Sequence, residues 1–416
     1  MKRWQWLLVA GVAGLAACSN HNDTGSSQSA EAAFDLHAPL SVPEPGHFHD
    51  TAPRALQGHY QQANWSDLPG WQADDAQNLW LALYNNCKGL MRPVSGSKAI
   101  PARAKPLAWQ AVCAAVAQKG DQVDAAQAKQ FLEDYLQPWQ LAGQGLVTGY
   151  YEPVVKGSRH QGGEYQWPMY GKPDDLLTID LGDLYPELVG KRVRGKVVDG
   201  KVVPYDSRAE IAKNPNKIPV IAWLHDPVEA FFLQVQGSGR VELDDGSQIR
   251  LAYADHNGHP YTSIGKWLAQ QGEMSASQAS MQNIKAWAQN HPNRVQEMLN
   301  ANHAMVFFKE EAISDDVAGP KGAYGIPLIA QRAVAVDPNY IPLGTPIFLA
   351  TTYPASQQAL QKVVMAQDTG AAIKGAARVD FFWGSGTKAG EQAGRMKQNS
   401  QVWLLWPKDA GAPEAR

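Results

Sequence analysis

The feature that most constrains the fold is a series of short apolar runs in the C-terminal part of the chain. Each run has four to six residues, and glycine, proline or aspartate turns separate one run from the next. The runs cover residues 305–308, 332–336, 345–350, 363–367, 379–383 and 401–406. Their length and their turns predict β-strands. Six such runs favour a small closed barrel over a parallel sheet with crossover helices.

Helical periodicity occurs earlier in the chain. A helix is expected after Asp74, a candidate cap, because apolar residues recur from Leu79 to Tyr84 at helical spacing. Further helices are expected at residues 108–116 and 125–135 and, twice, between residues 263 and 299. Residues 147–151 and 231–235 have the composition of strands. The chain should therefore be mainly β with accessory helices.

The N-terminus has the pattern of a secretory signal. Lys2 and Arg3 precede an apolar run over residues 6–17, which is too short to cross a bilayer as a helix. Residues 15–18, Leu-Ala-Ala-Cys, resemble the lipobox of bacterial lipoproteins, in which the cysteine becomes the acylated first residue. The alternative is an ordinary cleaved signal followed by an unrelated cysteine. We expect residues 1–17 to be a lipoprotein signal peptide and Cys18 to carry the lipid.

The residues after Cys18 extend this expectation. Ser19 replaces the aspartate that commonly retains such lipoproteins at the inner membrane, so the resemblance favours the outer membrane, with the protein facing the periplasm. No later segment offers the ~20 apolar residues of a transmembrane helix. Residues 18–49 lack periodicity and are rich in Ser, Asn, Ala, Pro and His, which is typical of a flexible tether.

Composition limits the partners. The 416 residues, 44% hydrophobic and 19% charged, can bury a large core and suffice for two or three domains. The net charge is −3, and it becomes more negative without Lys2 and Arg3, which argues against nucleic acid as a partner. Besides Cys18 the chain has Cys87 and Cys113, which can pair in an oxidising compartment. Buried free thiols fit the sequence equally well.

Carboxylates interrupt two of the C-terminal runs. Asp368 and Asp380 are 12 residues apart, each at one end of an apolar run. Strand alternation puts Asp380 on the same face as Arg378 and Phe382. Aromatic surroundings raise the pKa of a carboxyl, whereas a nearby arginine lowers it, and the sequence leaves this balance open. Asp337 opens a turn, where an aspartate often bonds its own backbone.

The C-terminal motifs resemble those of a known family. Residues 337–380, with Ile-Pro-Leu-Gly-Thr at 341–345, resemble the three-aspartate domain of the membrane-bound lytic murein transglycosylases of type A. Further blocks match this family in the same order along residues 50–408: residues 148–153, 207–211, 236–240, 257–261, 263–265 and 306–309. Ala371 is a departure, because the family usually has a second glycine there.

The resemblance implies a fold and a division of roles. The expected fold is a double-psi β-barrel, formed by residues 50–153 and 311–408, with a β-rich domain inserted at residues 154–310 and the substrate in the groove between them. Asp380 would be the single catalytic acid and base. Asp368 would support it, and Asp337 would belong to the same acidic cluster.

The resemblance also implies a substrate, the glycan strands of peptidoglycan. The expected reaction cleaves the β-1,4 bond between N-acetylmuramic acid and N-acetylglucosamine and leaves a 1,6-anhydro-muramic acid end, without a cofactor. The candidate sugar contacts are Thr148, Tyr150, Gln236, Ser238 and Gly239. Candidate protein partners are those of cell-wall synthesis and the divisome, and the sequence identifies none of them.

Other functions fit parts of the pattern. In a hydrolase, Asp368 would activate water. Asp368-Thr369-Gly370 resembles half of an aspartic protease site, whose two carboxylates share a proton, and the other Asp-Thr-Gly of the chain, at residues 23–25, lies in the predicted tether. A non-catalytic peptidoglycan-binding lipoprotein would use the same barrel. His256 and His259 lack a third ligand at useful spacing, so no metal is expected, and the glycines at 237 and 239 lack the rest of a dinucleotide motif.

Overall fold

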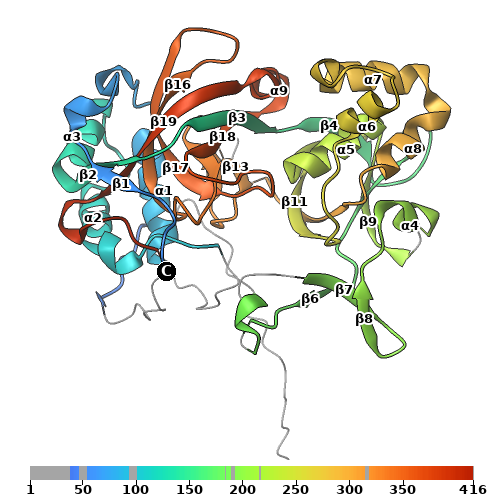
Figure 1. Ribbon diagram of the computed structural model, residues 1–416, viewed down its shortest axis with the longest axis horizontal. Helices are drawn as coiled ribbons and strands as arrows, with labels where there is room; N and C mark the ends of the chain where they lie inside the picture. Colours follow the sequence, from blue (N-terminus) through green and yellow to red (C-terminus); the bar gives the residue numbers. More distant parts are fainter. Residues whose placement is uncertain are drawn as a thin grey trace, which may run out of the picture. The chain divides into compact units, whose positions relative to one another are not determined.

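The computed structural model describes residues 38–45, 54–92, 101–182, 184–188, 193–214, 217–313 and 318–415 (Figure 1). The predicted signal peptide, Cys18 and most of the predicted tether lie outside these ranges. Residues 38–45, which the sequence assigns to the tether, instead contact the helical part of the fold, where the Leu40 amide donates to the Tyr84 hydroxyl at 2.9 Å. Leu40 is buried. Burial of this apolar side chain stabilises the contact of residues 38–45 with the helices.

The largest sheet has eight strands in the order β1-β2-β19-β16-β17-β15-β18-β3. Its strands are β1 (Tyr60–Gln62), β2 (Leu136–Leu141), β3 (Gly145–Glu152), β15 (Ala333–Val336), β16 (Pro346–Thr352), β17 (Ala359–Asp368), β18 (Arg378–Ser385) and β19 (Lys397–Pro407). Because β3 pairs with both β18 and β19, six of the strands close into a ring, the arrangement of a small barrel.

The closure of this ring corrects one strand prediction. Five of the six predicted C-terminal runs lie in the ring, but residues 305–308 fall in β12 (Val306–Glu311), which belongs to a second sheet. The sixth position is taken by β3, far earlier in the chain. Closure there requires glycine: a Cβ on Gly145 would lie 2.7 Å from the carbonyl oxygen of Ser400, its partner residue on β19.

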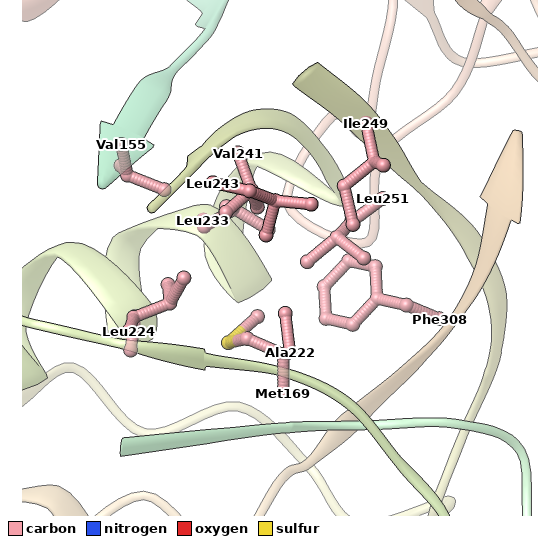
Figure 2. Packing of buried hydrophobic residues seen from close by; sticks show 11 residues of the cluster. Val155, Met169, Ala222, Leu224, Leu233, Val241, Leu243, Ile249, Leu251 and Phe308 are labelled. Atoms are coloured by element: carbon pink, nitrogen blue, oxygen red, sulfur yellow. The ribbon is translucent and has the colours of Figure 1, made fainter. Parts of the chain in front are cut away.

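A second, six-stranded sheet has the order β12-β11-β10-β4-β9-β5. Its remaining strands are β4 (Val154–Ser158), β5 (Trp167–Tyr170), β9 (Val220–Leu224), β10 (Ser238–Leu243) and β11 (Gln248–His256). Figure 2 shows their buried side chains, among them Met169, Val241 and Phe308, packed with Leu233 from helix α5 (Pro227–Gln236). A further cluster, which includes Tyr170 and Phe307, also packs on strands of this sheet.

The other elements are shorter. Two small sheets pair β13 (Ala318–Lys321) with β14 (Pro327–Ile329), and β7 (Val193–Val198) with β6 (Leu177–Ile179) and β8 (Lys201–Pro204). The further α-helices are α1 (Leu79–Met91), α2 (Pro106–Lys119), α3 (Ala125–Tyr135), α4 (Arg208–Lys213), α6 (Ile264–Gln270), α7 (Met281–Asn290), α8 (Val295–Asn300) and α9 (Gly386–Arg395). In the ranges that the structure describes, no helix is both long and apolar enough to span a membrane. The prediction of a mainly β chain with accessory helices is confirmed.

Residues 231–235, predicted as a strand, lie instead in helix α5. The flanking residues explain the difference. Asp226 caps the helix by accepting from the amides of Val228 and Glu229, Pro227 occupies the first turn, and Gly237 ends it with a left-handed φ of 79°. These signals outweigh the strand-like composition. As a helix, the apolar run can also bury its different faces in two separate hydrophobic clusters.

Two helix predictions also need correction. Asp74 does not cap α1, whose N-cap is Asn78; both Asp74 oxygens bind Arg332 instead. Between residues 263 and 299 the structure has α6, α7 and α8, where two helices were predicted. Pro292 separates the last two, since proline cannot continue the hydrogen bonding of α7.

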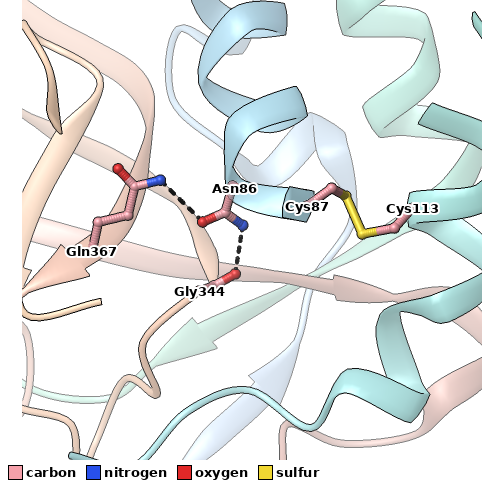
Figure 3. Close-up of a disulfide and its surroundings, with 5 residues drawn as sticks. All are labelled: Asn86, Cys87, Cys113, Gly344 and Gln367. Atoms are coloured by element: carbon pink, nitrogen blue, oxygen red, sulfur yellow. Dashed lines mark hydrogen bonds between the residues drawn. A yellow bond between two sulfur atoms is a disulfide. The ribbon is translucent and has the colours of Figure 1, made fainter. Parts of the chain in front are cut away.

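A disulfide joins the first two helices (Figure 3). Cys87 on α1 and Cys113 on α2 are bonded, with an S–S distance of 2.09 Å, so the structure settles the choice between a disulfide and free thiols. Next to it, the Asn86 side chain donates to the Gly344 carbonyl at 2.7 Å and accepts from Gln367 at 3.1 Å. The disulfide and these two bonds anchor α1 to α2 and to the ring strand β17.

We expect the double substitution Cys87→Ala with Cys113→Ala to lower the free energy of unfolding by about 3 kcal/mol. The bond closes a loop with a sequence separation of 26, and removing this constraint raises the entropy of the unfolded chain. Denaturant titration of both proteins under oxidising conditions measures the difference. The expectation fails if reduction of the wild-type chain leaves its unfolding midpoint unchanged.

Candidate active site

Sheet register brings two aspartates next to the same small residue. Ala335 on β15 pairs with Asp368 on β17 and with Asp380 on β18. Residues paired across adjacent strands share one face, so both carboxylates lie on the same face as Ala335. Two strand spacings put their Cα atoms about 10 Å apart. Ala335 is buried and has only a methyl side chain, so it adds little bulk between the two carboxylates.

The neighbouring strand β3 adds two hydroxyls to this face. Thr148 pairs with Asp380 and Tyr150 pairs with Phe382. The Thr148 hydroxyl donates to Asp380 Oδ1 at 2.5 Å, and the Tyr150 hydroxyl donates to Asp368 Oδ2 at 3.1 Å. Thus each aspartate receives one hydroxyl from β3.

Arg378 determines the direction of the bond to Asp380. Its Nη2 donates to the Thr148 oxygen at 2.9 Å. An arginine cannot accept, so the Thr148 proton is directed to Asp380. Burial raises the pKa of Asp380, although the Thr148 hydrogen bond and the Arg378 charge act to lower it. Burial therefore prevails in the balance that the sequence left open.

Asp368 is held by more donors. Its Oδ1 accepts from the amides of Ala323 and Thr369, both at 2.8 Å, and its Oδ2 accepts from Tyr150. Burial, with a smaller contribution from the Asp380 charge, raises the pKa of Asp368 to about 6. Burial and the two carboxylates raise the pKa of Tyr150 well above its usual value, so its hydroxyl remains a donor.

The two aspartates differ in how many of their carboxylate oxygens have hydrogen-bond partners. Asp380 Oδ2 has no hydrogen-bond partner among the described residues, and it is not fully buried. This oxygen is open to a ligand. Both oxygens of Asp368 are occupied. Of the two carboxylates, only Asp380 therefore has an oxygen without a hydrogen-bond partner among the described residues.

Asp337 is not joined to this pair by any contact that the described residues make. It is buried, and its Oδ1 accepts from the amide and the side chain of Asn339. Its Oδ2 accepts from the Gly375 amide at 2.9 Å. Asp337 therefore holds its own turn and fixes the loop between β17 and β18.

The candidate sugar contacts around Gln236 occupy a helix-to-strand turn. Gln236 ends α5, and its side chain accepts from the Tyr151 amide at 3.3 Å. Ser238, the first residue of β10, is half-buried. Gly239 is needed for packing, because a Cβ there would lie 2.6 Å from the Leu233 side chain. The order helix, glycine, strand is the reverse of a dinucleotide-binding motif.

Sequence reasoning missed the charge cluster at the end of β3. Glu152 is fully buried, and its carboxylate accepts from Arg240 at 2.9 Å, from Arg250 at 2.6 Å and from Ser385 at 2.6 Å. This cluster joins β18 to β10 and β11. Glu152 directly follows the predicted strand at 147–151, and an acidic residue at the end of an apolar run was the available signal.

No metal site is evident at the histidines. His256 Nδ1 accepts from the Gly258 amide, and His259 Nε2 contacts the Tyr205 carbonyl oxygen at 2.7 Å. Among the residues that the structure describes, no three His, Cys, Asp or Glu side chains are arranged to hold a metal ion.

Asp368→Asn should stabilise the folded chain at neutral pH. The folded-state pKa of Asp368 is raised, so this aspartate contributes stability below its unfolded pKa near 4, and the contribution is lost as the pH rises through about 6. We expect the variant to exceed the wild type by on the order of 1–2 kcal/mol at pH 7.5 and to match it at pH 4. Denaturant titrations at the two pH values provide the measurement. A difference that does not depend on pH would contradict the assigned environment.

Comparison with known proteins gives a consistent result. Two family profiles match: the MltA specific insert domain over residues 146–309 and the 3D domain over residues 332–406. Membrane-bound lytic murein transglycosylase A of Escherichia coli strain K12 is 34% identical over 280 residues, which cover 64% of this chain and 68% of that protein.

Solved structures agree. The crystal structure of MltA from Neisseria gonorrhoeae aligns with a TM-score of 0.73 at 34% identity, covering 91% of this chain and 97% of that chain. Escherichia coli MltA with bound chitohexaose aligns with a TM-score of 0.59 at 27% identity, covering 88% and 99%. Asp368 and Asp380 lie in the region matched by the 3D domain, and Thr148 and Tyr150 lie in that matched by the insert domain. The chain belongs to the family of membrane-bound lytic murein transglycosylase A.

Proposed function

We propose that this chain is a lytic transglycosylase of peptidoglycan, with Asp380 as its catalytic acid and base. The observation that carries the assignment of Asp380 is its single open oxygen on a carboxyl whose pKa burial has raised. The substrate follows from the relatives, which are named lytic murein transglycosylases, and from the oligosaccharide chitohexaose bound to one of them. The bond cleaved joins N-acetylmuramic acid to N-acetylglucosamine through a β-1,4 linkage.

The reaction needs one proton to move out and back. Protonated Asp380 donates from Oδ2 to the leaving oxygen of N-acetylglucosamine while the bond to muramic acid C1 breaks. The muramic acid C6 hydroxyl then bonds to C1, and its proton returns to Asp380. The product is a 1,6-anhydro ring, and no water is consumed. Because the hydroxyl belongs to the same sugar, little entropy is lost when it approaches C1.

Asp368 has a supporting role in this scheme. Its two oxygens are occupied by Ala323, Thr369 and Tyr150, so it lacks the open position that a nucleophile or a water-activating base requires. The Asp380 charge contributes to the raised pKa of Asp368, so the charge states of the two carboxyls are coupled. A hydrolase, in which Asp368 activates water, is the alternative that the product analysis below distinguishes.

The product experiment tests the function directly. The full-length chain, purified in mild detergent, is incubated with peptidoglycan, and the soluble fragments are analysed by mass spectrometry. We expect fragments that end in 1,6-anhydro-muramic acid. Reducing ends, heavier by one water, would mean a hydrolase, and binding to peptidoglycan without release of fragments would mean a non-catalytic binding protein.

We further propose that the ring has the double-psi topology of the family. The proposed ranges are residues 50–153 and 311–408 for the catalytic domain and residues 154–310 for the insertion. The glycan would occupy a groove between these parts. Thr148 and Tyr150 lie beside the aspartates, which supports a position at the bond to be cleaved. Gln236, Ser238 and Gly239 would contact sugars further along the groove.

The location of the protein is a separate proposal. Lipid on Cys18 would anchor the chain in the outer membrane with the enzyme facing the periplasm, and the name of the Escherichia coli relative, membrane-bound, supports membrane association. Cys18→Ala is expected to move the protein to the soluble periplasmic fraction. Recovery of this variant in the outer membrane would contradict lipid anchoring at that position.

Thr148→Val tests the proton placement on Asp380. The hydroxyl favours the charged form of Asp380, so its loss should raise the pKa of this carboxyl further. We expect the alkaline limb of the pH–rate profile to move to higher pH and kcat to fall about tenfold. Thr148→Ser keeps the hydroxyl and is the control. An unshifted profile in the valine variant would refute the placement.

A further inference from the structure

A small pocket lies beside Arg208, away from the two aspartates. Its volume is about 60 Å³, and Arg208 lies in its wall together with Trp167, Phe231 and Ala212. A space of this size holds roughly four or five heavy atoms, since one water-sized sphere needs about 10–15 Å³ of such volume. The pocket therefore accepts a small group but not a sugar ring.

Arg208 is buried without a counter-charge. It is 5% exposed, and its Nε and Nη2 donate to the carbonyls of Asn302 and Ala304 and to the side chain of Gln234. No carboxylate of the described residues forms an ion pair with it. Burial lowers the pKa of Arg208 to about 10, so the guanidinium keeps its charge at neutral pH. A buried charge that is compensated only by neutral acceptors is costly, which favours the entry of an anion.

One nitrogen of Arg208 is available to a ligand. Nη1 has no hydrogen-bond partner among the described residues, and it is not fully buried. It therefore retains accessible surface, and the pocket is the space that Arg208 lines. Its two N–H groups are donors that a carboxylate oxygen can accept.

The lining defines the rest of the ligand. Trp167 and Phe231 present ring surfaces, and the Arg208 guanidinium lies 5.1 Å from the Phe231 ring centre. The polar side chains of Tyr170, Gln234 and Gln296 also line the pocket. A small group with a carboxylate on one side and a methyl on the other matches this mixture of polar and apolar walls. Peptidoglycan carries such groups on its stem peptides, which consist of short chains of small amino acids.

We infer that the pocket at Arg208 binds a carboxylate of the peptidoglycan stem peptide. The inference rests on the proposed function, because that function supplies the substrate. Helix α5 connects the pocket with the candidate active site: Gln234 binds Arg208, and Gln236, two residues later, accepts from the Tyr151 amide next to Tyr150. A strand bound at both places would be held more firmly than by its sugars alone.

Calorimetry on the full-length chain tests the site with a matched pair of probes, N-acetyl-D-alanine and its amide. We expect the carboxylate to bind with a Kd on the order of 1 mM and the neutral amide at least tenfold more weakly. Ala212→Leu fills the pocket while keeping the Arg208 side chain, and it should abolish binding. Ala209→Leu, the same substitution elsewhere on α4, should leave it intact. Equal binding of both probes, or binding that survives Ala212→Leu, overturns the inference.

Rates on two substrates identify the source of the carboxylate. Ala212→Leu is expected to raise KM several-fold on strands that carry stem peptides and to leave kcat, and the KM on strands stripped of peptides, unchanged. A larger increase in KM on the strands without peptides would mean that the pocket binds the lactyl carboxylate of muramic acid. That result would overturn the stem-peptide assignment. If the wild-type chain cleaves neither substrate, the proposed function fails, and the calorimetric result remains a separate test of the pocket.

Discussion

Asp380→Asn is expected to lower kcat on peptidoglycan about 10³-fold while leaving the chain folded. Asparagine can still accept the Thr148 hydrogen bond through its side-chain oxygen, so the local geometry is kept. It cannot deliver a proton from the position of Oδ2, and general acid–base catalysis by one side chain contributes roughly 10²–10⁴-fold. Release of anhydro-muropeptides measures the loss, and thermal unfolding shows whether the variant is folded. Full activity in a folded variant would remove Asp380 from the mechanism.

Two matched variants make this result specific. Asp368→Asn removes the other carboxylate of the pair, keeps the contacts with the two amides through its oxygen and should reduce activity less, by about tenfold. Asp337→Asn disturbs the turn and the loop at Gly375 and should reduce stability as well as activity. If Asp368→Asn is inactive while Asp380→Asn retains a substantial rate, the roles of the two aspartates are exchanged.

The active-site face could be predicted from the sequence because strand alternation is local. The alternation of Arg378, Asp380 and Phe382 holds in β18, and register with β3 then places Thr148 and Tyr150 on the same face. What the sequence could not supply was the direction of the hydroxyls. Thr148 and Tyr150 each donate to an aspartate, and these bonds depend on strands that are more than 200 residues apart in the sequence.

The errors have a common physical origin. The apolar run at 231–235 was assigned to a strand because its composition outweighed the capping signals on either side, Asp226 before it and Gly237 after it. Residues 305–308 were assigned to the ring although β12 pairs with β11. The lone charge of Arg208 and the buried Glu152 cluster depend on distant partners, and no periodicity in one chain identifies such partners.

The largest stability effect is expected at Arg332. Its side chain is 1% exposed and bonds Asp74 with two nitrogens, at 2.9 and 2.7 Å, while Nε and Nη1 donate to the carbonyls of Gln77 and Val363. Arg332→Met would leave the Asp74 carboxylate buried without its partner. Loss of one member of a buried ion pair costs roughly 3–5 kcal/mol, so we expect about 4 kcal/mol less stability in denaturant titration.

A double-mutant cycle measures the interaction free energy between Arg332 and Asp74 separately from the other contacts of each side chain. Asp74→Asn alone should also destabilise, because it leaves only the exposed Asp75 to balance the Arg332 charge. Asp74→Asn combined with Arg332→Met should cost less than the sum of the two single changes. Arg159→Met, which breaks the exposed pair with Glu310, is the control and should cost less than about 1 kcal/mol. Arg332 directly precedes β15, the strand whose Ala335 lies between the two aspartates. If the changes in unfolding free energy of the two single variants simply add, the stability at this site comes from packing of the side chains and not from the ion pair. The position of β15 would then not depend on Asp74.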